Sequence, residues 1–175
     1  MNITVQTISF ADTTGYLIAG TRRFPCTLGR RGVALDKQEG DGRTPVGTYP
    51  LRKVFYRADR LEKPETGLPV EILAEKTGWC EDPAHPDYNK QIILPHSSTH
   101  DRMTRGDHLY DLVIVVGYND DPPVAGRGSA IFIHLAREDF SPTAGCVGLK
   151  KEDLIEVMKL CDSFSVITIL PPCNC

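Results

Sequence analysis

Hydrophobic and polar residues alternate along much of the chain, which indicates strands more often than helices. Ile3 and Val5 lie between polar neighbours, as in a strand with one exposed face. Residues 16–19 and 22–26 flank Gly20-Thr21, and this spacing predicts a hairpin. Four further runs read as strands, of which the middle two are almost entirely apolar and therefore central in a sheet: residues 91–94, 112–118, 130–135 and 164–170.

One segment has the period of a helix instead. Between residues 151 and 162, four apolar side chains fall on one side: Leu154, Ile155, Met158 and Cys161. The polar segment 57–69 fits either a helix or a loop. A chain of 175 residues is long enough to bury a core, so we expect one domain over residues 1–175, with residues 170–175 as a flexible tail.

Composition and charge exclude several classes of function. Apolar residues make up 41% and charged residues 25% of the chain, as in an ordinary globular domain. The net charge is −3 and there is no basic block, so we expect no nucleic-acid partner. No run of 18 apolar residues is present, so we predict no membrane span. The N-terminus lacks the charged start and apolar stretch of a secretory signal.

Six cysteines raise the question of a disulfide or zinc framework. No Cys-x-x-Cys pair occurs, although zinc knuckles are usually built from two such pairs, so we predict no metal site. Cys80 and His85 are close enough to share a metal, but two more ligands would be needed. Cys161 lies on the apolar side of the helix and is expected in the core. Cys173 and Cys175 belong to the expected tail.

A histidine and a cysteine offer the strongest candidate chemistry. His134 ends an apolar run, and Cys146 follows Gly145 on a later loop. A thiolate nucleophile needs a base to ionise it and backbone amides to hold an oxyanion. His134 can be that base, and a turn at Gly145 can aim the amides of Gly145 and Cys146 at one oxygen. The alternative for this pair is a buried structural cysteine and a core histidine.

Three sequence blocks in order resemble the L,D-transpeptidase catalytic domain, the YkuD-type fold. The first is Thr143-Ala144-Gly145-Cys146 with His134 upstream, and the second is the segment 41–51, DGRTPVGTYPL. The third, residues 78–119, is similar to one subgroup of the family. The commoner motif is Ser-His-Gly-Cys followed by a hydrophobic residue and then Arg or Asn. In this sequence Ala144 replaces the histidine of that motif, and Gly148 replaces its Arg or Asn. Substrate recognition must therefore come from other residues.

The resemblance implies a fold and a reaction. The fold is mainly β with short helices, a YkuD-like β-sandwich with one helix after the catalytic cysteine. The reaction is peptidoglycan L,D-transpeptidation, in which a Cys146–His134 thiolate–imidazolium pair takes the acyl group of one stem peptide and passes it to the amine of a second. Thr143 and Gly145 shape the site, and the helix N-terminus helps to lower the pKa of Cys146. No cofactor is required, and carbapenems are expected covalent inhibitors.

Five residues are candidates for binding the substrate. Arg127 or Arg137 can grip a carboxylate with two hydrogen bonds. Asn119 can orient substrate or simply end its strand. Trp79 and Tyr88 can line a peptide cleft, and core packing is the alternative for Trp79. The stretch 95–111, PHSSTHDRMTRGDHLYD, reads as a loop that can cover the cleft as a lid, although its histidine spacing would also suit metal ligands on a helix.

Other functions remain open. If water resolves the thioester, the same site is an L,D-carboxypeptidase or an amidase. A non-catalytic wall-binding module is the third possibility. The resemblance places the protein in the periplasm or cell envelope, and the cytoplasm is the alternative because no signal is recognised.

Overall fold

The computed structural model describes residues 1–172. Its elements are β1 (Asn2–Gln6), β2 (Thr14–Ala19), β3 (Arg22–Thr27), β4 (Val33–Ala34), β5 (Thr44–Pro45), β6 (Gly47–Tyr56), β7 (Val70–Ile72), β8 (Thr77–Cys80), β9 (Gln91–Ile93), β10 (His100–Arg102), β11 (Leu112–Val116), β12 (Phe132–Leu135), β13 (Val147–Leu149), α1 (Lys151–Leu160) and β14 (Val166–Ile169). Among these residues, no helix is long and apolar enough to cross a membrane.

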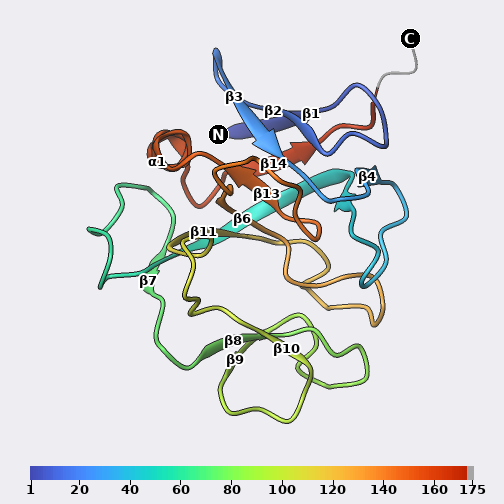
Figure 1. Cartoon of the computed structure of the whole chain (residues 1–175), viewed down its shortest axis with the longest axis vertical. Helices are drawn as coiled ribbons and strands as arrows, with labels where there is room; N and C mark the ends of the chain where they lie inside the picture. The colour runs from blue at the N-terminus through green and yellow to red at the C-terminus, as the bar shows by residue number, and fades with distance from the viewer. Residues whose placement is uncertain (173–175) are drawn as a thin grey trace.

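The main sheet closes on itself. Its strands follow the order β11-β12-β13-β3-β2-β1-β14-β6-β7, and β6 pairs back onto β11, so that the first strand meets the eighth (Figure 1). The predicted fold class is confirmed, because the chain is mainly β with one short helix after Cys146. The hairpin predicted about Gly20 is also confirmed as β2 and β3, which pair antiparallel.

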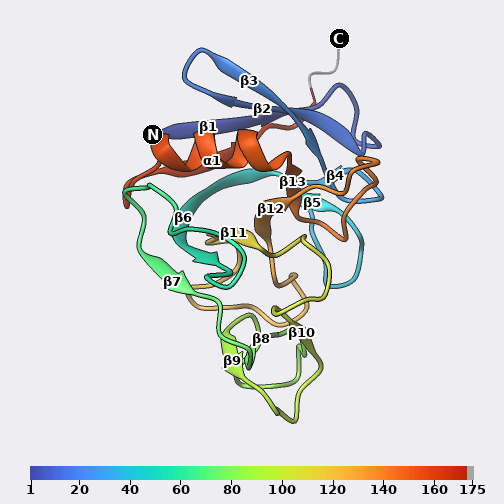
Figure 2. The ribbon, with the colours of Figure 1, turned by 60° about the vertical axis from the view of Figure 1, so that its left-hand side comes forward.

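The largest core lies inside this closed sheet. The helix α1 lies between the β1–β2 pair and β6, where Leu154, Val157 and Met158 are buried (Figure 2). Cys161 caps the helix C-terminus and is 1% exposed, as the helical pattern predicted. The helix itself ends at Leu160, two residues earlier than expected.

The two most apolar runs form central strands. β11 and β12 pair antiparallel with Val113 opposite His134, and every residue in both strands is buried. They are buried on both faces because the interior core covers one face and a second cluster covers the other. The prediction of central strands here is confirmed.

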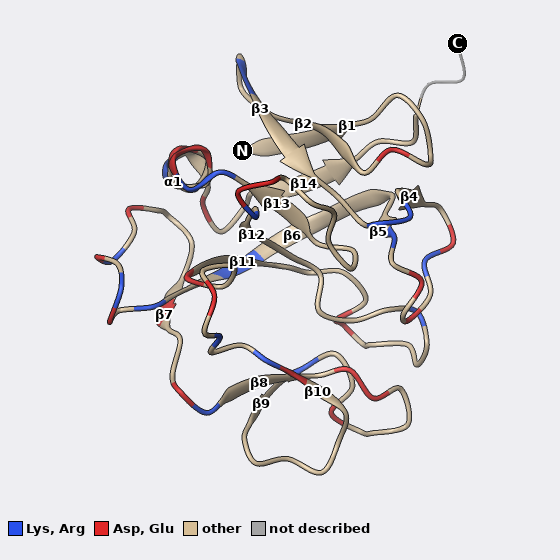
Figure 3. Cartoon of the chain, in the orientation of Figure 1, with Lys and Arg blue, Asp and Glu red and all other residues tan. Residues whose placement is uncertain are grey.

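A small sheet of β8, β9 and β10 covers the outer face of β11 and β12. We call residues 74–111 the cap (Figure 1, lower part). Its Trp79, Met103 and Tyr110 pack with Phe55 and Phe132 in the second cluster. Basic and acidic residues both occur along this part of the chain and lie next to each other around β10 (Figure 3).

Three parts of the chain were predicted incompletely or left open by the sequence pattern. β6 is ten residues long. The sequence predicted only a turn in this region, because Pro50 and charged residues interrupt the apolar pattern of the strand. The segment 57–69 is irregular except for turns. The expected tail begins at Leu170, whose amide donates a hydrogen bond to Val5 O; Cys173 and Cys175 lie outside the described residues.

Candidate active site

Cys146 and His134 lie on the same face of the main sheet. Side chains alternate along β12, so Phe132 and His134 face the cap while Ile133 and Leu135 belong to the interior core. Cys146 precedes β13, which pairs parallel with β12, and its Sγ accepts a hydrogen bond of 3.4 Å from the Phe132 amide. Both side chains therefore line one pocket of about 430 Å³.

The loop that carries the sulfur is held by its own threonine. Thr143 Oγ1 donates a hydrogen bond of 2.7 Å to Cys146 O and accepts one of 3.1 Å from the Gly145 amide. The Thr143 amide donates to Leu28 O at 2.8 Å, which fixes the loop to the end of β3. Thr143 thus shapes the turn before the cysteine. Because the Gly145 amide bonds to Thr143 Oγ1, it is not available to bind an oxyanion in this state.

The second sequence block braces the same loop. Gly145 has φ +146°, and a Cβ there would lie 2.8 Å from Arg43 O. Thr44 Oγ1 accepts a hydrogen bond of 2.9 Å from the Gly29 amide, and Gly29 forms a β-bridge with Thr143. The segments around Arg43 and Cys146, which are far apart in sequence, are therefore one packed unit.

Gly145→Ala is expected to damage this unit. The added methyl group needs a φ that side chains rarely adopt and collides with the Arg43 carbonyl, so we expect a loss of about 2–3 kcal/mol in unfolding free energy. Urea unfolding of wild type and variant measures this loss. Gly126→Ala is the matched control: it also has positive φ but no atom within 4 Å of its Cβ position. An equal loss in both variants would show that φ strain alone is responsible.

Burial keeps the Cys146 thiol protonated. The residue is 6% exposed, and its Sγ donates a hydrogen bond of 3.2 Å to Ala130 O. Burial raises the pKa of Cys146 to about 12. The nearby helix N-terminus was expected to lower this pKa, but burial is the largest cause of its shift.

His134 is also neutral, and its tautomer is defined. Nδ1 lies 2.8 Å from Leu135 O, so Nδ1 carries the proton and Nε2 keeps its lone pair. Burial lowers the pKa of His134 to about 4. The Tyr110 ring packs edge-on against the imidazole at 5.3 Å. No direct hydrogen bond joins His134 to Cys146, whose thiol instead bonds to Ala130 O, so the resting pair is a neutral thiol and a neutral imidazole.

The cap contributes two carboxyl groups to the pocket. β8 and β10 pair with Cys80 opposite His100, which places Glu81 and Asp101 at the same edge. Burial, followed by repulsion from Asp101, raises the pKa of Glu81 to about 7. Burial also raises the pKa of Asp101, although the Tyr110 hydroxyl donates a hydrogen bond of 2.8 Å to it.

Arginines line the pocket as well. Arg105 is engaged, because it pairs with Asp107 at 2.7 Å. Arg30 and Arg137 are exposed and have no ion pair with any of residues 1–172, so both are free to bind a carboxylate. Arg127, the other arginine proposed for this role, pairs with Asp36 at 3.0 Å and does not line this pocket.

Three other predicted substrate-binding residues lie outside the pocket. Asn119 closes a turn, with hydrogen bonds to the amide and carbonyl of Val124 and to Gly128 O. The Tyr88 hydroxyl donates to Glu39 and accepts from the Gly128 amide. Trp79 is 7% exposed in the second cluster and follows the core-packing alternative.

Asn89 joins the cap to the nucleophile. Its Oδ1 accepts hydrogen bonds from Trp79 Nε1 at 2.9 Å and the Ala130 amide at 3.0 Å. Its Nδ2 donates to Tyr118 O and Asn119 O. Ala130 has φ +54°, and its carbonyl is the acceptor for the Cys146 thiol.

Glu81, Asp101 and Tyr110 were not predicted as parts of the site. The stretch 95–111 was expected to cover the cleft, and Asp101, Arg105 and Tyr110 from it do line the pocket. The only sequence signal for these residues was that 95–111 is a polar stretch with one tyrosine. Which of its residues face the sulfur depends on the register of β10 against β8.

The chain is similar to one protein family and to several solved structures. A family model for the L,D-transpeptidase catalytic domain, YkuD, matches residues 6–169. The chain is similar to the crystal structure of the helical cell shape determining protein Pgp2 from Campylobacter jejuni, with a TM-score of 0.46 and 16% identity over 98% of this chain and 48% of that one. It is also similar to Mycobacterium tuberculosis L,D-transpeptidase 1, with a TM-score of 0.40 and 12% identity over 96% of this chain and 58% of that one.

The chain spans about half the length of these solved structures. No curated protein sequence matches it. The family match contains His134, the Thr143–Cys146 motif and the segment that braces it. On that match the chain belongs to the L,D-transpeptidase catalytic domain family.

Proposed function

We propose that this protein is a peptidoglycan L,D-transpeptidase with Cys146 as nucleophile and His134 as general base. The observation that supports this most is one pocket containing both side chains, free arginines and two carboxyl groups. The arginines suit the carboxylate of a donor stem peptide. The carboxyl groups suit the ammonium group of an acceptor.

The first half-reaction is acylation. His134 Nε2 takes the thiol proton while Sγ attacks the carbonyl between an L-centre and the terminal D-residue. This proton transfer accompanies the attack because burial disfavours a free thiolate. The carbon–nitrogen bond breaks, His134 returns its proton to the leaving D-amino acid, and a thioester remains on Cys146. Rotation of the thiol away from Ala130 O must precede these events.

Backbone amides stabilise the oxyanion. Residues 1–172 offer no acceptor to the Cys146 amide, so it is free for this role. The Gly145 amide joins it only after release from Thr143 Oγ1. Each donor is worth about 3–4 kcal/mol in comparable acyl-transfer sites.

The second half-reaction uses an amine. The acceptor ammonium group first gives one proton to the Glu81 carboxylate, and the resulting neutral amine attacks the thioester and passes a second proton to His134. The carbon–sulfur bond then breaks, and Cys146 recovers the proton. An ammonium group held by Glu81 and Asp101 stays close to the thioester, which favours transfer over hydrolysis.

Glu81→Gln and Asp101→Asn are expected to shift the products from cross-links towards hydrolysis by about tenfold, with acylation changed far less. Because the pKa of Glu81 is raised to about 7, its charge is lost as pH falls through 7, so the wild-type ratio should also fall there. Quantifying both products against pH tests this. Glu62→Gln, outside the pocket, is the control, and an unchanged ratio in the pocket variants would remove the acceptor role from these acids.

Mass spectrometry of purified stem peptides incubated with the protein tests the main proposal. We expect a cross-linked product, loss of the terminal D-residue and no product with Cys146→Ala. Shortened stems without cross-links would establish the alternative, an L,D-carboxypeptidase or amidase. Carbapenems should add to Cys146 alone, and peptide mapping locates that adduct. The substrate class supports a periplasmic or envelope location.

A further inference from the structure

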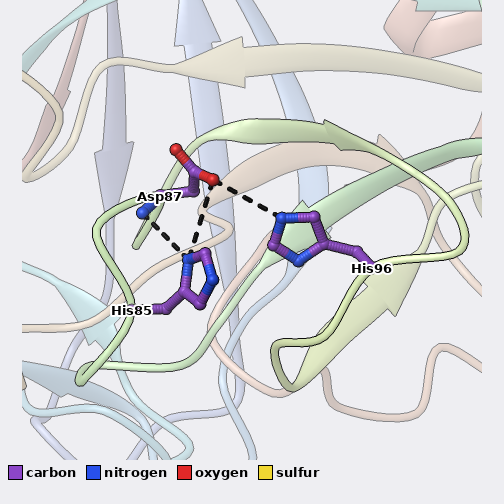
Figure 4. A group of neighbouring side chains, drawn as sticks. All are labelled: His85, Asp87 and His96. Carbon is purple, nitrogen blue, oxygen red and sulfur yellow. Dashed lines mark hydrogen bonds and ion pairs between the residues drawn. The ribbon is translucent and has the colours of Figure 1, made fainter.

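Two histidines and an aspartate converge on the cap, away from the candidate active site. His85 and Asp87 lie on the loop between β8 and β9, and His96 lies on the connection between β9 and β10 (Figure 4). One nitrogen or oxygen from each lies within 4.8 Å of the others. All three side chains are half-buried, so the group is both fixed and open to ions.

The distances within this group are longer than hydrogen bonds. Asp87 Oδ2 lies 3.4 Å from His96 Nε2 and 3.7 Å from His85 Nδ1. A nitrogen–oxygen hydrogen bond spans about 2.7–3.2 Å. Zinc bonds of about 2.0–2.2 Å in a tetrahedral site would separate ligand atoms by about 3.3–3.6 Å. The spacing therefore fits ligands around an ion better than ligands bonded to each other.

The hydrogen bonds around the group show which nitrogen of His85 carries the lone pair. The Asp87 amide donates a hydrogen bond of 3.1 Å to His85 Nδ1, so this nitrogen is unprotonated. The same nitrogen lies 3.7 Å from the Asp87 carboxylate, so an ion between them could bind both. Coordination replaces that amide hydrogen bond with a metal–nitrogen bond.

The second histidine has an outer partner of the kind that metal-bound imidazoles use. His96 Nδ1 accepts a hydrogen bond of 3.2 Å from the Ser98 amide and lies 2.7 Å from Ser98 Oγ. Because Nδ1 accepts from the Ser98 amide, Nε2 carries the ring proton and faces Asp87 in this state. A metal at Nε2 displaces that proton, and Nδ1 can then take up a proton and donate it to Ser98 Oγ. Such an outer hydrogen bond fixes both ring orientation and tautomer.

The geometry points to a binding site for a divalent transition metal of the zinc type, with His85, Asp87 and His96 as ligands and water in the fourth position. Two imidazoles and one carboxylate suit zinc, whereas magnesium and calcium prefer oxygen ligands. A bound ion ties two loops of the cap together. Glu81 begins the first loop, and Asp101 follows the second, so the ion would hold the acidic side of the pocket in place.

Calorimetric titration with zinc chloride tests this site. The protein carries Cys173→Ser and Cys175→Ser, which removes that cysteine pair as a competing ligand. We expect one bound equivalent and a higher melting temperature with zinc. His96→Ala and Asp87→Asn should each weaken zinc binding by about 100-fold, and circular dichroism checks that both remain folded. His108→Ala removes an imidazole that is outside the group and should bind as the parent does.

Cobalt provides a second readout. Cobalt(II) in a tetrahedral histidine–carboxylate site absorbs visible light, and this absorption should disappear in His85→Ala and persist in Cys146→Ala. Equal zinc affinity in the parent, His96→Ala and Asp87→Asn would overturn the proposal. So would loss of binding in Cys146→Ala, since the metal would then lie in the catalytic pocket.

Discussion

Cys146→Ala is expected to abolish turnover while the protein stays folded. No other group in the pocket can form the thioester, so the rate should fall by about 10⁴-fold or more. The substitution removes one small side chain and its contacts with Ala130 and Phe132. The loop itself is fixed by Thr143, Gly145 and the Arg43 segment, so we expect a stability change of no more than about 2 kcal/mol.

Product formation from stem peptides and urea unfolding measure the two effects. Cys161→Ala is the matched control, because it is a buried cysteine in the other core. It should leave turnover unchanged although it also loses some stability. Full activity in Cys146→Ala would refute the proposed mechanism, and a loss of activity in Cys161→Ala equal to that in Cys146→Ala would point to stability as the cause.

His134→Ala should reduce turnover by about 10³-fold or more. The resting thiol is protonated at neutral pH, so attack needs a base at Nε2. Cys146→Ala with His134→Ala should be no slower than Cys146→Ala alone, because the two residues act as one unit. Additive losses would show that His134 acts independently of the sulfur.

The pH profile of acylation distinguishes a base from a packing residue. The pKa of His134 is lowered to about 4, so the imidazole stays neutral, and able to accept a proton, at every pH above that value. Acylation by a carbapenem should therefore decline as pH falls towards 4, rather than near the ordinary histidine value of about 6.5. His134→Gln keeps polar bulk and should remove this dependence. An acid limb near 6.5 in wild type would contradict the tautomer and burial described here.

The central part of the fold could be predicted because its sequence signals are local. The apolar runs of β11 and β12 and the helical period of α1 each identify their element without knowledge of the rest. β6 could not be predicted in this way. Its ten residues pair with β14, β11 and β7 in turn, so different parts face different surroundings and no single period results.

The site was likewise predictable where its sequence signals are local. Cys146, His134 and Gly145 stand out as a motif, and the Arg43 segment that braces them was visible as a second block. The protonation state was not, because it depends on burial by the cap. Arg127 and Arg137 look alike in sequence, and only the tertiary structure pairs the first with Asp36 and leaves the second in the pocket.

The hydrogen bonds of Asn89 restrict which amino acids position 89 can hold. Asparagine tolerates its φ of +56°, and its amide supplies two donors and one oxygen that accepts twice. Aspartate would set an anionic oxygen against two carbonyl oxygens, and glutamine is one carbon too long for a buried position. The residue at position 89 therefore indicates how the cap is attached to the sheet. A related protein that has the cysteine and histidine of this site but another residue in place of Asn89 must attach its cap by other contacts.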